Sequence, residues 1–324
     1  MKGFLAWVLG VGLLVSRLAQ GAMPPDVTVA RFKGDRQAAV SLTFDDALPS
    51  HIESAIPTLD RYGLKGTFFL LLNNIRPEST SNWDAWRAAV SNGHEAGSHS
   101  FTHPMLTQIR DQALLDYEIS GSAKEIETHL GVRPTSFAYP SSDFNHDVRQ
   151  VVRLVYAFDR ADCRVWGGAG FQMVDGIKHV DQALRRKDWL FCMLHGVGEA
   201  TWGPIDPEIF DGLVAHLARQ SDAVWTDTYS RVAAYIAKRN AIKVIFRDVK
   251  PDSFDFRLRL PDDPHIAMIP KWPLTVKVAL DGRDPKLARA MVDGSLLALT
   301  PSVCGHYLLA DIETDGRWIQ WSWK

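Results

Sequence analysis

Three apolar segments of the sequence end in side chains that can bind a metal ion or transfer a proton. Asp45 and Asp46 directly follow the run AAVSLTF. His99 and His103 lie four residues apart in SHSFTHP, and His195 ends the run WLFCML. Two imidazoles and a carboxylate with open coordination positions suit a divalent metal, usually zinc. The remaining carboxylate and imidazole would be free for proton transfer, so the residue types favour metal-assisted acid–base chemistry.

The elements that must position these residues alternate between strand and helix from Ala38 to about Asn240. Strands are expected at 38–44, 66–72, 94–100, 135–140, 189–196 and 223–226, and helices at 50–63, 82–93, 111–131, 146–155, 207–220 and 227–239. This alternation predicts an α/β fold, a parallel sheet or barrel covered by helices. Functional groups in such folds cluster at the carboxyl ends of the strands, which would bring the three segments together.

The pattern changes after about Asn240. The segments FDFRLRL, LTVKVAL and RWIQWSWK alternate apolar and polar residues with period two, and turn residues separate them. We therefore expect a barrel domain over residues 22–240 and a small antiparallel, sandwich-like β domain over residues 241–324.

The first 21 residues have the features of a secretory signal peptide. Lys2 precedes an apolar core that runs from Phe4 to Val15, and Ala19–Gly21 is a small-x-small cleavage pattern. An uncleaved membrane anchor is the alternative, but the apolar run is short for a membrane span. We expect an exported protein, periplasmic or extracellular, with no integral membrane segment after cleavage.

Composition and cysteine content narrow the class of protein further. The 324 residues are 46% hydrophobic and 23% charged, and the net charge of −2 gives no sign of a nucleic-acid partner. Cys163 and Cys304 could pair after export, whereas Cys192 lies in an apolar run and is expected to be buried. Three cysteines define no disulfide framework, and the oligomeric state cannot be inferred.

Each of these signals is weak when it is taken alone. A histidine at a strand end is more often structural than a metal ligand, and an Asp-Asp pair often begins a solvated loop. A His-x-x-x-His spacing also recurs by chance. Their joint placement after apolar strands of one α/β fold is what favours a functional site.

The motifs TFDD, GHEAGSHSFTHP and WLFCMLHG, in this order, resemble the polysaccharide deacetylase family (carbohydrate esterase family 4) over roughly residues 40–239. The resemblance implies a distorted (β/α) barrel with one divalent metal ion. The ligand types themselves would accept Zn²⁺, with Co²⁺ or Ni²⁺ as alternatives. The resemblance implies that Asp46, His99 and His103 hold the metal. By the same resemblance, Asp45 is the catalytic base and His195 the general acid.

The sequence departs from the family pattern in the segment FAYPSSDFN. Members of the family often carry an arginine there that contacts the base, whereas this chain has Ala138 at that position. Arg160 is a possible replacement, although a surface position for it is the favoured interpretation. Asp159 and Asp162 are the candidates for the acidic partner that usually orients the acid histidine. Ala47 stands where the family commonly has glycine after the Asp pair.

Substrate contacts are expected from loops at the same strand ends. Tyr139, Ser141, Trp166 and Trp202 are the candidate substrate-binding residues, with the tryptophans stacking on sugar rings and a backbone N–H near Ser141 as the oxyanion donor. The alternative for both tryptophans is packing against neighbouring helices. Three more, Trp318, Trp321 and Trp323, belong to the last strand, where packing between the domains is favoured over carbohydrate binding.

These observations predict a metal-dependent deacetylase whose partner is an acetylated polysaccharide, with the acetyl group on nitrogen or on oxygen. Two alternatives remain open. One is a non-catalytic carbohydrate-binding protein on a deacetylase scaffold, and the other is a metal-dependent amidase that acts on non-sugar amides.

Overall fold

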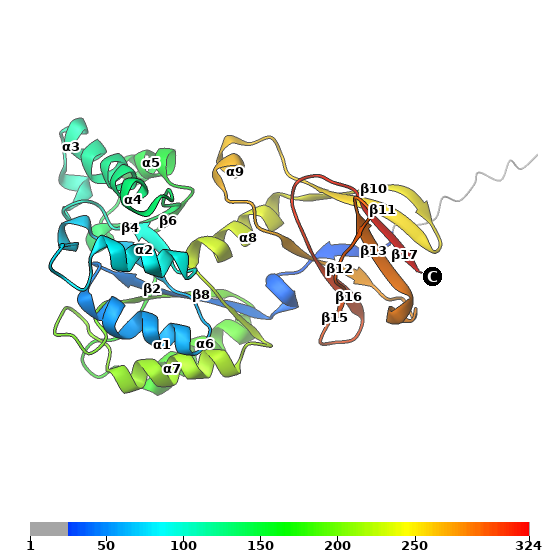
Figure 1. The fold of residues 1–324 in the computed structure, drawn as a ribbon, viewed down its shortest axis with the longest axis horizontal. Helices are drawn as coiled ribbons and strands as arrows, with labels where there is room; N and C mark the ends of the chain where they lie inside the picture. Colours follow the sequence, from blue (N-terminus) through cyan, green and yellow to red (C-terminus); the bar gives the residue numbers. More distant parts are fainter. Residues whose placement is uncertain (1–24, 324) are drawn as a thin grey trace, which may run out of the picture.

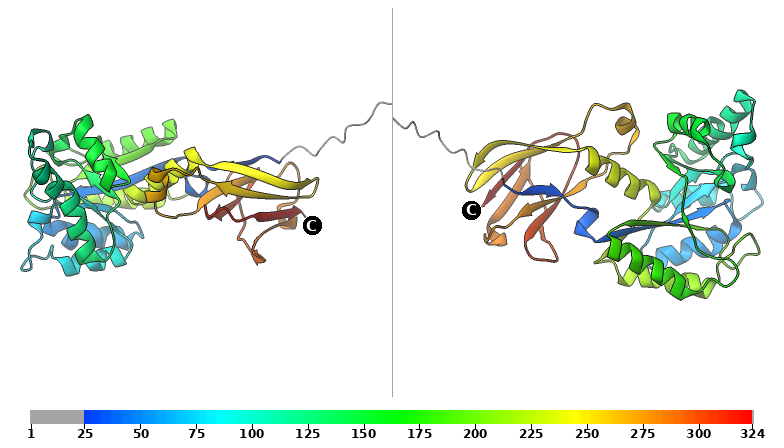
Figure 2. Two further views of the ribbon diagram at one scale, coloured as in Figure 1. Left: turned by 90° about the horizontal axis from the view of Figure 1, so that it is seen from above. Right: turned by 180° about the vertical axis from the view of Figure 1, so that it is seen from behind.

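The computed structural model describes residues 25–323, which form two parts that lie end to end (Figures 1 and 2). One part is a mainly parallel sheet covered by helices, and the other consists of two antiparallel sheets. The predicted signal peptide at 1–21 lies outside the described residues. Among those described, no helix has both the length and the apolar character needed to cross a membrane.

The sheet of the first part is open and parallel, with the order β6-β5-β4-β3-β2-β8-β7 and β9 paired to β2. Its strands are β2 (Ala38–Asp45), β3 (Thr67–Leu70), β4 (Glu95–Ser98), β5 (Ser136–Ala138), β6 (Phe158–Arg160), β7 (Arg164–Val165), β8 (Trp189–Leu194) and β9 (Val224–Thr226). Every residue of β2 is buried, as expected for a central strand of a parallel sheet covered on both faces. The expected barrel-like α/β fold is confirmed, as a half-barrel whose edges β6 and β7 are not joined.

Helices cover this sheet in the alternating order that the sequence predicts. They are α1 (Ile56–Arg61), α2 (Trp83–Ser91), α3 (Gln112–Asp116), α4 (Ser122–Leu130), α5 (His146–Val155), α6 (Met173–Arg186), α7 (Pro207–Arg219) and α8 (Tyr229–Ala241). The single helix expected at 111–131 is divided into α3 and α4 by a π-helical turn over Tyr117–Gly121. Helix α6 was not predicted, although a capping box between Gln172 and Asp175 marks its start.

The second part has the predicted antiparallel β architecture. Its two sheets have the orders β1-β12-β16-β15 and β10-β11-β17-β13-β14. The elements are β1 (Val27–Val29), β10 (Lys243–Lys250), β11 (Ser253–Arg259), α9 (Pro264–Met268), β12 (Leu274–Ala279), β13 (Ala288–Val292), β14 (Ser295–Leu296), β15 (Thr300–Pro301), β16 (Tyr307–Ile312) and β17 (Ile319–Trp323). Alternate residues of β11 point into a shared apolar core, with Phe254, Phe256 and Leu258 almost completely buried.

The two parts are joined by more than the chain between them. Strand β1 pairs with β12, so residues 27–29 belong to the β sheets, whereas the sequence-based division at 240 placed them with the barrel. The apolar core of the β sheets includes Trp225 and Tyr235 from the barrel side. The Tyr235 hydroxyl donates to the Ala30 carbonyl at 2.9 Å, and buried Lys238 donates to the Pro270 carbonyl at 2.6 Å.

Candidate metal centre and active site

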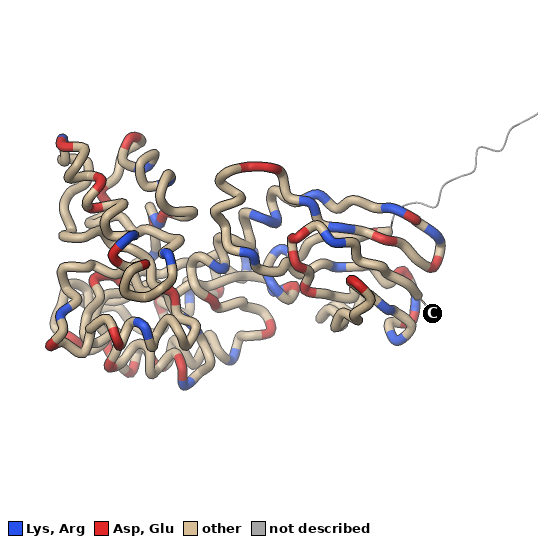
Figure 3. The backbone as a smooth tube through the Cα atoms, turned by 45° about the horizontal axis from the view of Figure 1, so that its top comes forward, with Lys and Arg blue, Asp and Glu red and all other residues tan. Residues whose placement is uncertain are grey.

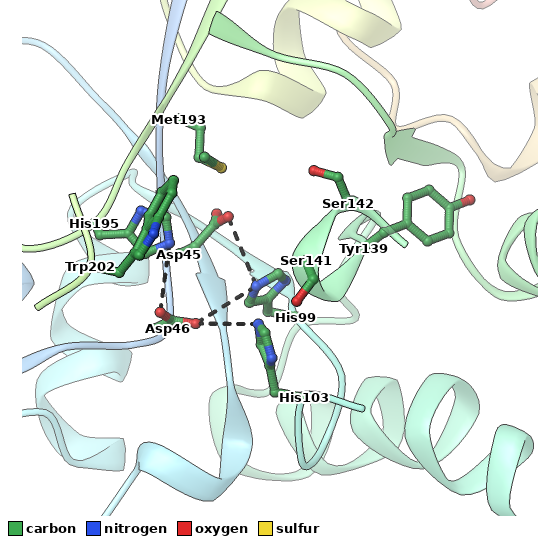
Figure 4. Close-up of a pocket in the computed structure, with 10 residues that line it drawn as sticks. All are labelled: Asp45, Asp46, His99, His103, Tyr139, Ser141, Ser142, Met193, His195 and Trp202. Atoms are coloured by element: carbon green, nitrogen blue, oxygen red, sulfur yellow. Dashed lines mark ion pairs between the residues drawn. The ribbon is translucent and has the colours of Figure 1, made fainter. Parts of the chain in front are cut away.

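A cavity of about 410 Å³ opens at the carboxyl ends of the parallel strands (Figure 4). Acidic and histidine side chains gather on one side of it, and aromatic and hydroxyl side chains lie around them. It is lined by Asp45, Asp46, His99, His103, Tyr139, Ser141, Ser142, Met193, His195 and Trp202. The three segments singled out in the sequence therefore meet, as a parallel sheet requires.

The end of β2 turns sharply to present both carboxylates. Asp45 is the last residue of the strand, and Asp46 and Ala47 follow with φ of 83° and 53°. This left-handed backbone is strained for residues with a Cβ, and glycine would adopt it at a lower energetic cost. Ala47 adopts it while completely buried, and its carbonyl accepts a hydrogen bond from Ser81.

Asp46, His99 and His103 form a group that can hold a metal ion. Their ligand atoms all lie within 4.8 Å of one another. The Oδ1 atom of Asp46 is 3.7 Å from Nε2 of His99 and 3.9 Å from Nε2 of His103. This oxygen is buried and accepts no hydrogen bond from the described residues. One carboxylate oxygen and two imidazole nitrogens around a common point are a donor set that fits a divalent cation.

The hydrogen bond of His99 determines which of its nitrogens faces this point. Its Nδ1 lies 2.9 Å from the Ala138 carbonyl, an arrangement that makes Nδ1–H the donor and leaves the lone pair of Nε2 toward the carboxylates. Burial lowers the pKa of His99, although Asp45 and Asp46 act in the opposite direction. The neutral imidazole needed for metal binding is therefore favoured.

Buried Glu118 holds the loop between the two histidines. Its carboxylate accepts hydrogen bonds from the backbone N–H groups of Phe101 and Thr102, at 2.8 and 2.9 Å, and from the Thr102 hydroxyl at 2.6 Å. The loop is also strained, since His103 has a φ of 64° and its N–H donates to the Ser100 hydroxyl. Three hydrogen bonds to one buried charge keep this backbone in place.

Arg160 is buried beside Asp45, and this position corrects the favoured interpretation of Arg160 as a surface residue. Its Nη2 forms an ion pair with Oδ2 of Asp45, and its Nη1 donates to the Thr43 hydroxyl at 3.1 Å. Both charged side chains are 3% exposed. Arg160 is the register partner of Ala138 across β5 and β6. The guanidinium that contacts Asp45 therefore comes from β6, the strand next to β5, where Ala138 stands in place of the expected arginine.

The ion pair affects the protonation of Asp45. Burial alone would raise the pKa of Asp45, but Arg160 and, to a lesser extent, His99 lower it, and the net result is a pKa below the usual value for aspartate. Asp45 is therefore ionised at neutral pH, with its Oδ1 atom free of hydrogen bonds from the described residues.

His195 lies on the opposite side of the Asp pair. Its Nε2 is 3.7 Å from Oδ2 of Asp46, and its ring packs against that of Trp202 in a T-shaped arrangement with centroids 4.8 Å apart. The predicted acidic partners do not reach it. Asp159 pairs with Arg149 instead, and Asp162 accepts from a backbone N–H, so Nδ1 of His195 has no hydrogen-bond partner in the described part of the chain.

Residues 33–155 match the family model for polysaccharide deacetylase. Over these residues the chain is similar to polysaccharide deacetylases.

Individual relatives and solved structures are similar to the chain at low sequence identity. The chain is 24% identical over 294 residues to a gellan lyase of Bacillus sp, covering 79% of this chain and 12% of the relative. It is 27% identical to the peptidoglycan-N-acetylglucosamine deacetylase PgdA of Listeria monocytogenes, over 47% of this chain and 32% of the relative. The chain thus spans less than a third of either relative. Among solved structures, the chain aligns with the Xyl-CE4 domain of a multidomain xylanase from the hindgut metagenome of Trinervitermes trinervoides. The TM-score is 0.46 and the identity 24%, over 60% of this chain and 89% of that domain.

The parallel-sheet part of the chain contains one further residue near the site that sequence reasoning missed, His51. It is completely buried in the π-helical turn His51–Ala55 that precedes α1. Its Nδ1 accepts from the Leu48 N–H at 3.2 Å, so its Nε2–H donates to the His195 carbonyl at 3.1 Å. Burial lowers the pKa of His51 to about 3 and keeps it neutral. It ties the turn after the Asp pair to the strand end that carries His195.

The candidate substrate-binding residues divide into two groups. Tyr139, Ser141 and Trp202 line the cavity, and Trp202 is 64% exposed. Trp166 does not reach the cavity, because it is completely buried in the apolar core and its indole N–H donates to His179. Its apolar surface is already used in packing, so the expectation that it stacks on a sugar is wrong. The suggested Cys163–Cys304 pair is also absent, since both thiols are free.

Proposed function

We propose that this protein is a metal-dependent hydrolase that removes acetyl groups from a polysaccharide. The observation that carries the proposal is the cluster of Asp46, His99 and His103 beside an ionised, arginine-paired Asp45 and an opposing His195. A divalent ion bound to the first three residues would lower the pKa of a water molecule and polarise the acetyl carbonyl. Zn²⁺ suits these ligands, and Co²⁺ and Ni²⁺ are accepted alternatives.

Asp45 is positioned to act as the general base. Its ion pair with Arg160 fixes one carboxylate oxygen and leaves the other without a hydrogen-bond donor. That free oxygen accepts the proton of the water that attacks the acetyl carbon. Arg160 touches the base and keeps it ionised and oriented, so we assign it a positioning role.

His195 is positioned to act as the general acid. It lies across the cavity from the histidine ligands, and protonated His195 donates to the sugar nitrogen or oxygen as its bond to the acetyl carbon breaks. Acetate and the deacetylated sugar are the products. A backbone N–H near Ser141, in the turn that lines the cavity, stabilises the oxyanion.

The substrate is an acetylated polymer, with an N-acetyl sugar as the first candidate and an O-acetyl sugar as the second. Similarity to a peptidoglycan-N-acetylglucosamine deacetylase supports an N-acetyl substrate. The exposed indole of Trp202 at the rim provides a flat apolar surface on which a sugar ring can stack. With its predicted signal peptide, the protein would meet such a polymer outside the cytoplasm.

The experiment that tests the proposal is acetate release after metal removal and metal return. Chitin oligomers, peptidoglycan and acetylated xylan are each incubated with the chelated protein and then with added Zn²⁺, Co²⁺ or Ni²⁺. We expect acetate from at least one of the three, dependent on the added metal. A protein that binds metal and glycan but releases no acetate from any of them would favour the carbohydrate-binding alternative.

A further inference from the structure

One surface of the β domain differs from the rest of the molecule in its charge. Acidic and basic residues are interspersed over both parts of the chain (Figure 3). In the five-stranded sheet, Phe254, Phe256 and Leu258 of β11 are buried, so the residues between them face outward. Cross-strand partners of these outward residues share the same face. We call this the basic sheet face, and its cations are Lys243, Arg247, Arg257, Arg259 and Arg289.

Most of these cations lack an acidic partner. Asp255 is the one acid on the basic sheet face among the described residues, and it pairs with Arg247 at 2.9 Å. Asp248, beside the face, lies 3.7 Å from Arg247 as well. Arg289 donates only to backbone carbonyls. In residues 25–323, no ion pair involves Lys243, Arg257, Arg259 or Arg289.

The spacing of these cations is unfavourable for the protein by itself. Lys243 lies directly opposite Arg259 in the ladder between β10 and β11, a separation of about 5 Å between strands. Arg257 precedes Arg259 by two residues on β11, about 7 Å away along the strand. Like charges placed directly opposite in a sheet lower stability. An anion bound across the face would remove this repulsion.

Trp318 holds two of the guanidinium groups in fixed places. The Arg247 guanidinium lies 4.0 Å and that of Arg257 4.7 Å from the centre of the indole ring. Arg257 also has a buried Nε with no hydrogen-bond partner among the described residues. Guanidinium groups that are already ordered lose less conformational entropy when they bind a planar anion.

We propose that the basic sheet face binds an acidic polysaccharide through its carboxylate groups, an inference that rests on the proposed action of the catalytic domain on polysaccharides. Guanidinium groups pair with carboxylates through two parallel hydrogen bonds. Gln320 and Ser322 of β17 also lie on this face, between β11 and β13. Their side chains can form hydrogen bonds with sugar hydroxyls. The face thus combines cations with neutral polar groups, as a hydroxyl-rich anionic chain requires.

The basic sheet face is remote from the catalytic cavity. The chain passes from β1 in the β domain into the amino end of β2, and the cavity lies at the carboxyl end of that strand, about 25 Å further on. Binding at the face holds the protein on the polymer and raises the local concentration of acetyl groups near the cavity. It does not take part in the chemical step.

The test measures binding of the whole protein to polygalacturonate, with neutral dextran as the comparison polymer. The double variant Arg257→Gln/Arg259→Gln removes two cations from the face. The control Lys271→Gln/Lys286→Gln removes two exposed cations elsewhere in the same domain. We expect binding to polygalacturonate to fall tenfold or more in the first variant, to stay within twofold in the control, and to weaken with salt. Dextran should not bind.

Two further measurements separate this proposal from misfolding and from the proposed function. The melting temperature of the Arg257→Gln/Arg259→Gln variant should be equal to or higher than that of the parent, because repulsion is removed. Acetate release from a short uncharged oligosaccharide should be the same in the parent and in the Arg257→Gln/Arg259→Gln variant, because the basic sheet face takes no part in the chemical step. The proposal would be overturned by an equal loss of binding in the double variant and the control, or by no binding of polygalacturonate at low salt. Tighter binding to phosphatidylglycerol vesicles or to duplex DNA than to polygalacturonate would also overturn it.

Discussion

Arg160 on β6 lowers the pKa of Asp45 at the end of β2, and its removal should therefore change the pH dependence of the reaction. Without the guanidinium, burial raises the pKa of Asp45, so the base is protonated over a wider range. We expect Arg160→Gln to lower kcat/KM about 100-fold at neutral pH and to move the acid limb of the pH profile upward. Arg153→Gln, which affects an exposed arginine paired with Asp159, is the control. An acid limb that stays in place would contradict this role.

Buried neutral His51 should make the protein less stable in mild acid. Its folded pKa is about 3 and its unfolded pKa is 6.5, so below pH 6.5 the unfolded chain binds a proton that the folded chain does not. The contribution of neutral His51 to the free energy of unfolding is complete above pH 6.5, and it falls by about 1.4 kcal/mol per pH unit toward pH 3.

Denaturant unfolding at several pH values measures this contribution. The His51→Gln variant should show a shallower loss of unfolding free energy between pH 6 and pH 4 than the parent. The variant His146→Gln, at an exposed position, should keep the slope of the parent. Equal slopes in all three proteins would show that His51 does not titrate in this way.

Among individual residues, the sequence allowed prediction of those that belong to a recognisable motif and also lie at the end of a strand. Asp45, Asp46, His99, His103 and His195 all lie at the cavity because parallel strands bring their ends together. It could not predict the partner of Asp45, since the register between β5 and β6 that places Arg160 beside Ala138 is a tertiary feature. His51 gave no signal either, because it lies in a helical turn away from any strand end.

At the scale of elements, the strained loop between His99 and His103 depends on the π-helical turn Tyr117–Gly121 that supplies Glu118. We expect Glu118→Gln to weaken metal binding 10- to 100-fold, because the buried charge that orders the loop is lost. Zinc titration of the purified protein measures the affinity. Glu125→Gln, on α4 in an exposed pair with His129, should leave it unchanged. Equal affinities for all three proteins would show that the loop does not need this carboxylate.

Periodicity located most elements but not the interruptions within them. Helix α5 begins and ends where its pattern predicts, since an apolar stripe and the Asn145 cap agree. The region 111–131 has one continuous helical pattern, and only packing against the rest of the fold shows where the π-helical turn divides it. Helix α6 had a readable cap and apolar spacing and could have been predicted.

At the scale of the whole molecule, the apolar core of the β sheets extends into the barrel, so the two parts should unfold together. Tyr235 on α8 packs into that core and donates to the Ala30 carbonyl next to β1. Tyr235→Phe removes one buried hydrogen bond and should cost about 1 kcal/mol. Calorimetry should show one transition for the parent and one for the variant, with the variant's lowered by about 2 °C. Two separate transitions, with only one of them shifted, would contradict a shared core.

The roles of the two neighbouring carboxylates are tested most directly by comparing Asp45→Asn with Asp46→Asn in one experiment. Bound metal and acetate release are measured on the same samples, with a substrate on which the parent is active. The two residues are neighbours in the chain with different assigned roles, so the variants control for each other. The assignment of Asp45 as base and Asp46 as metal ligand predicts that Asp45→Asn keeps one bound metal ion per chain and loses acetate release, whereas Asp46→Asn loses both. Full activity in Asp45→Asn, or undiminished metal affinity in Asp46→Asn, would contradict it.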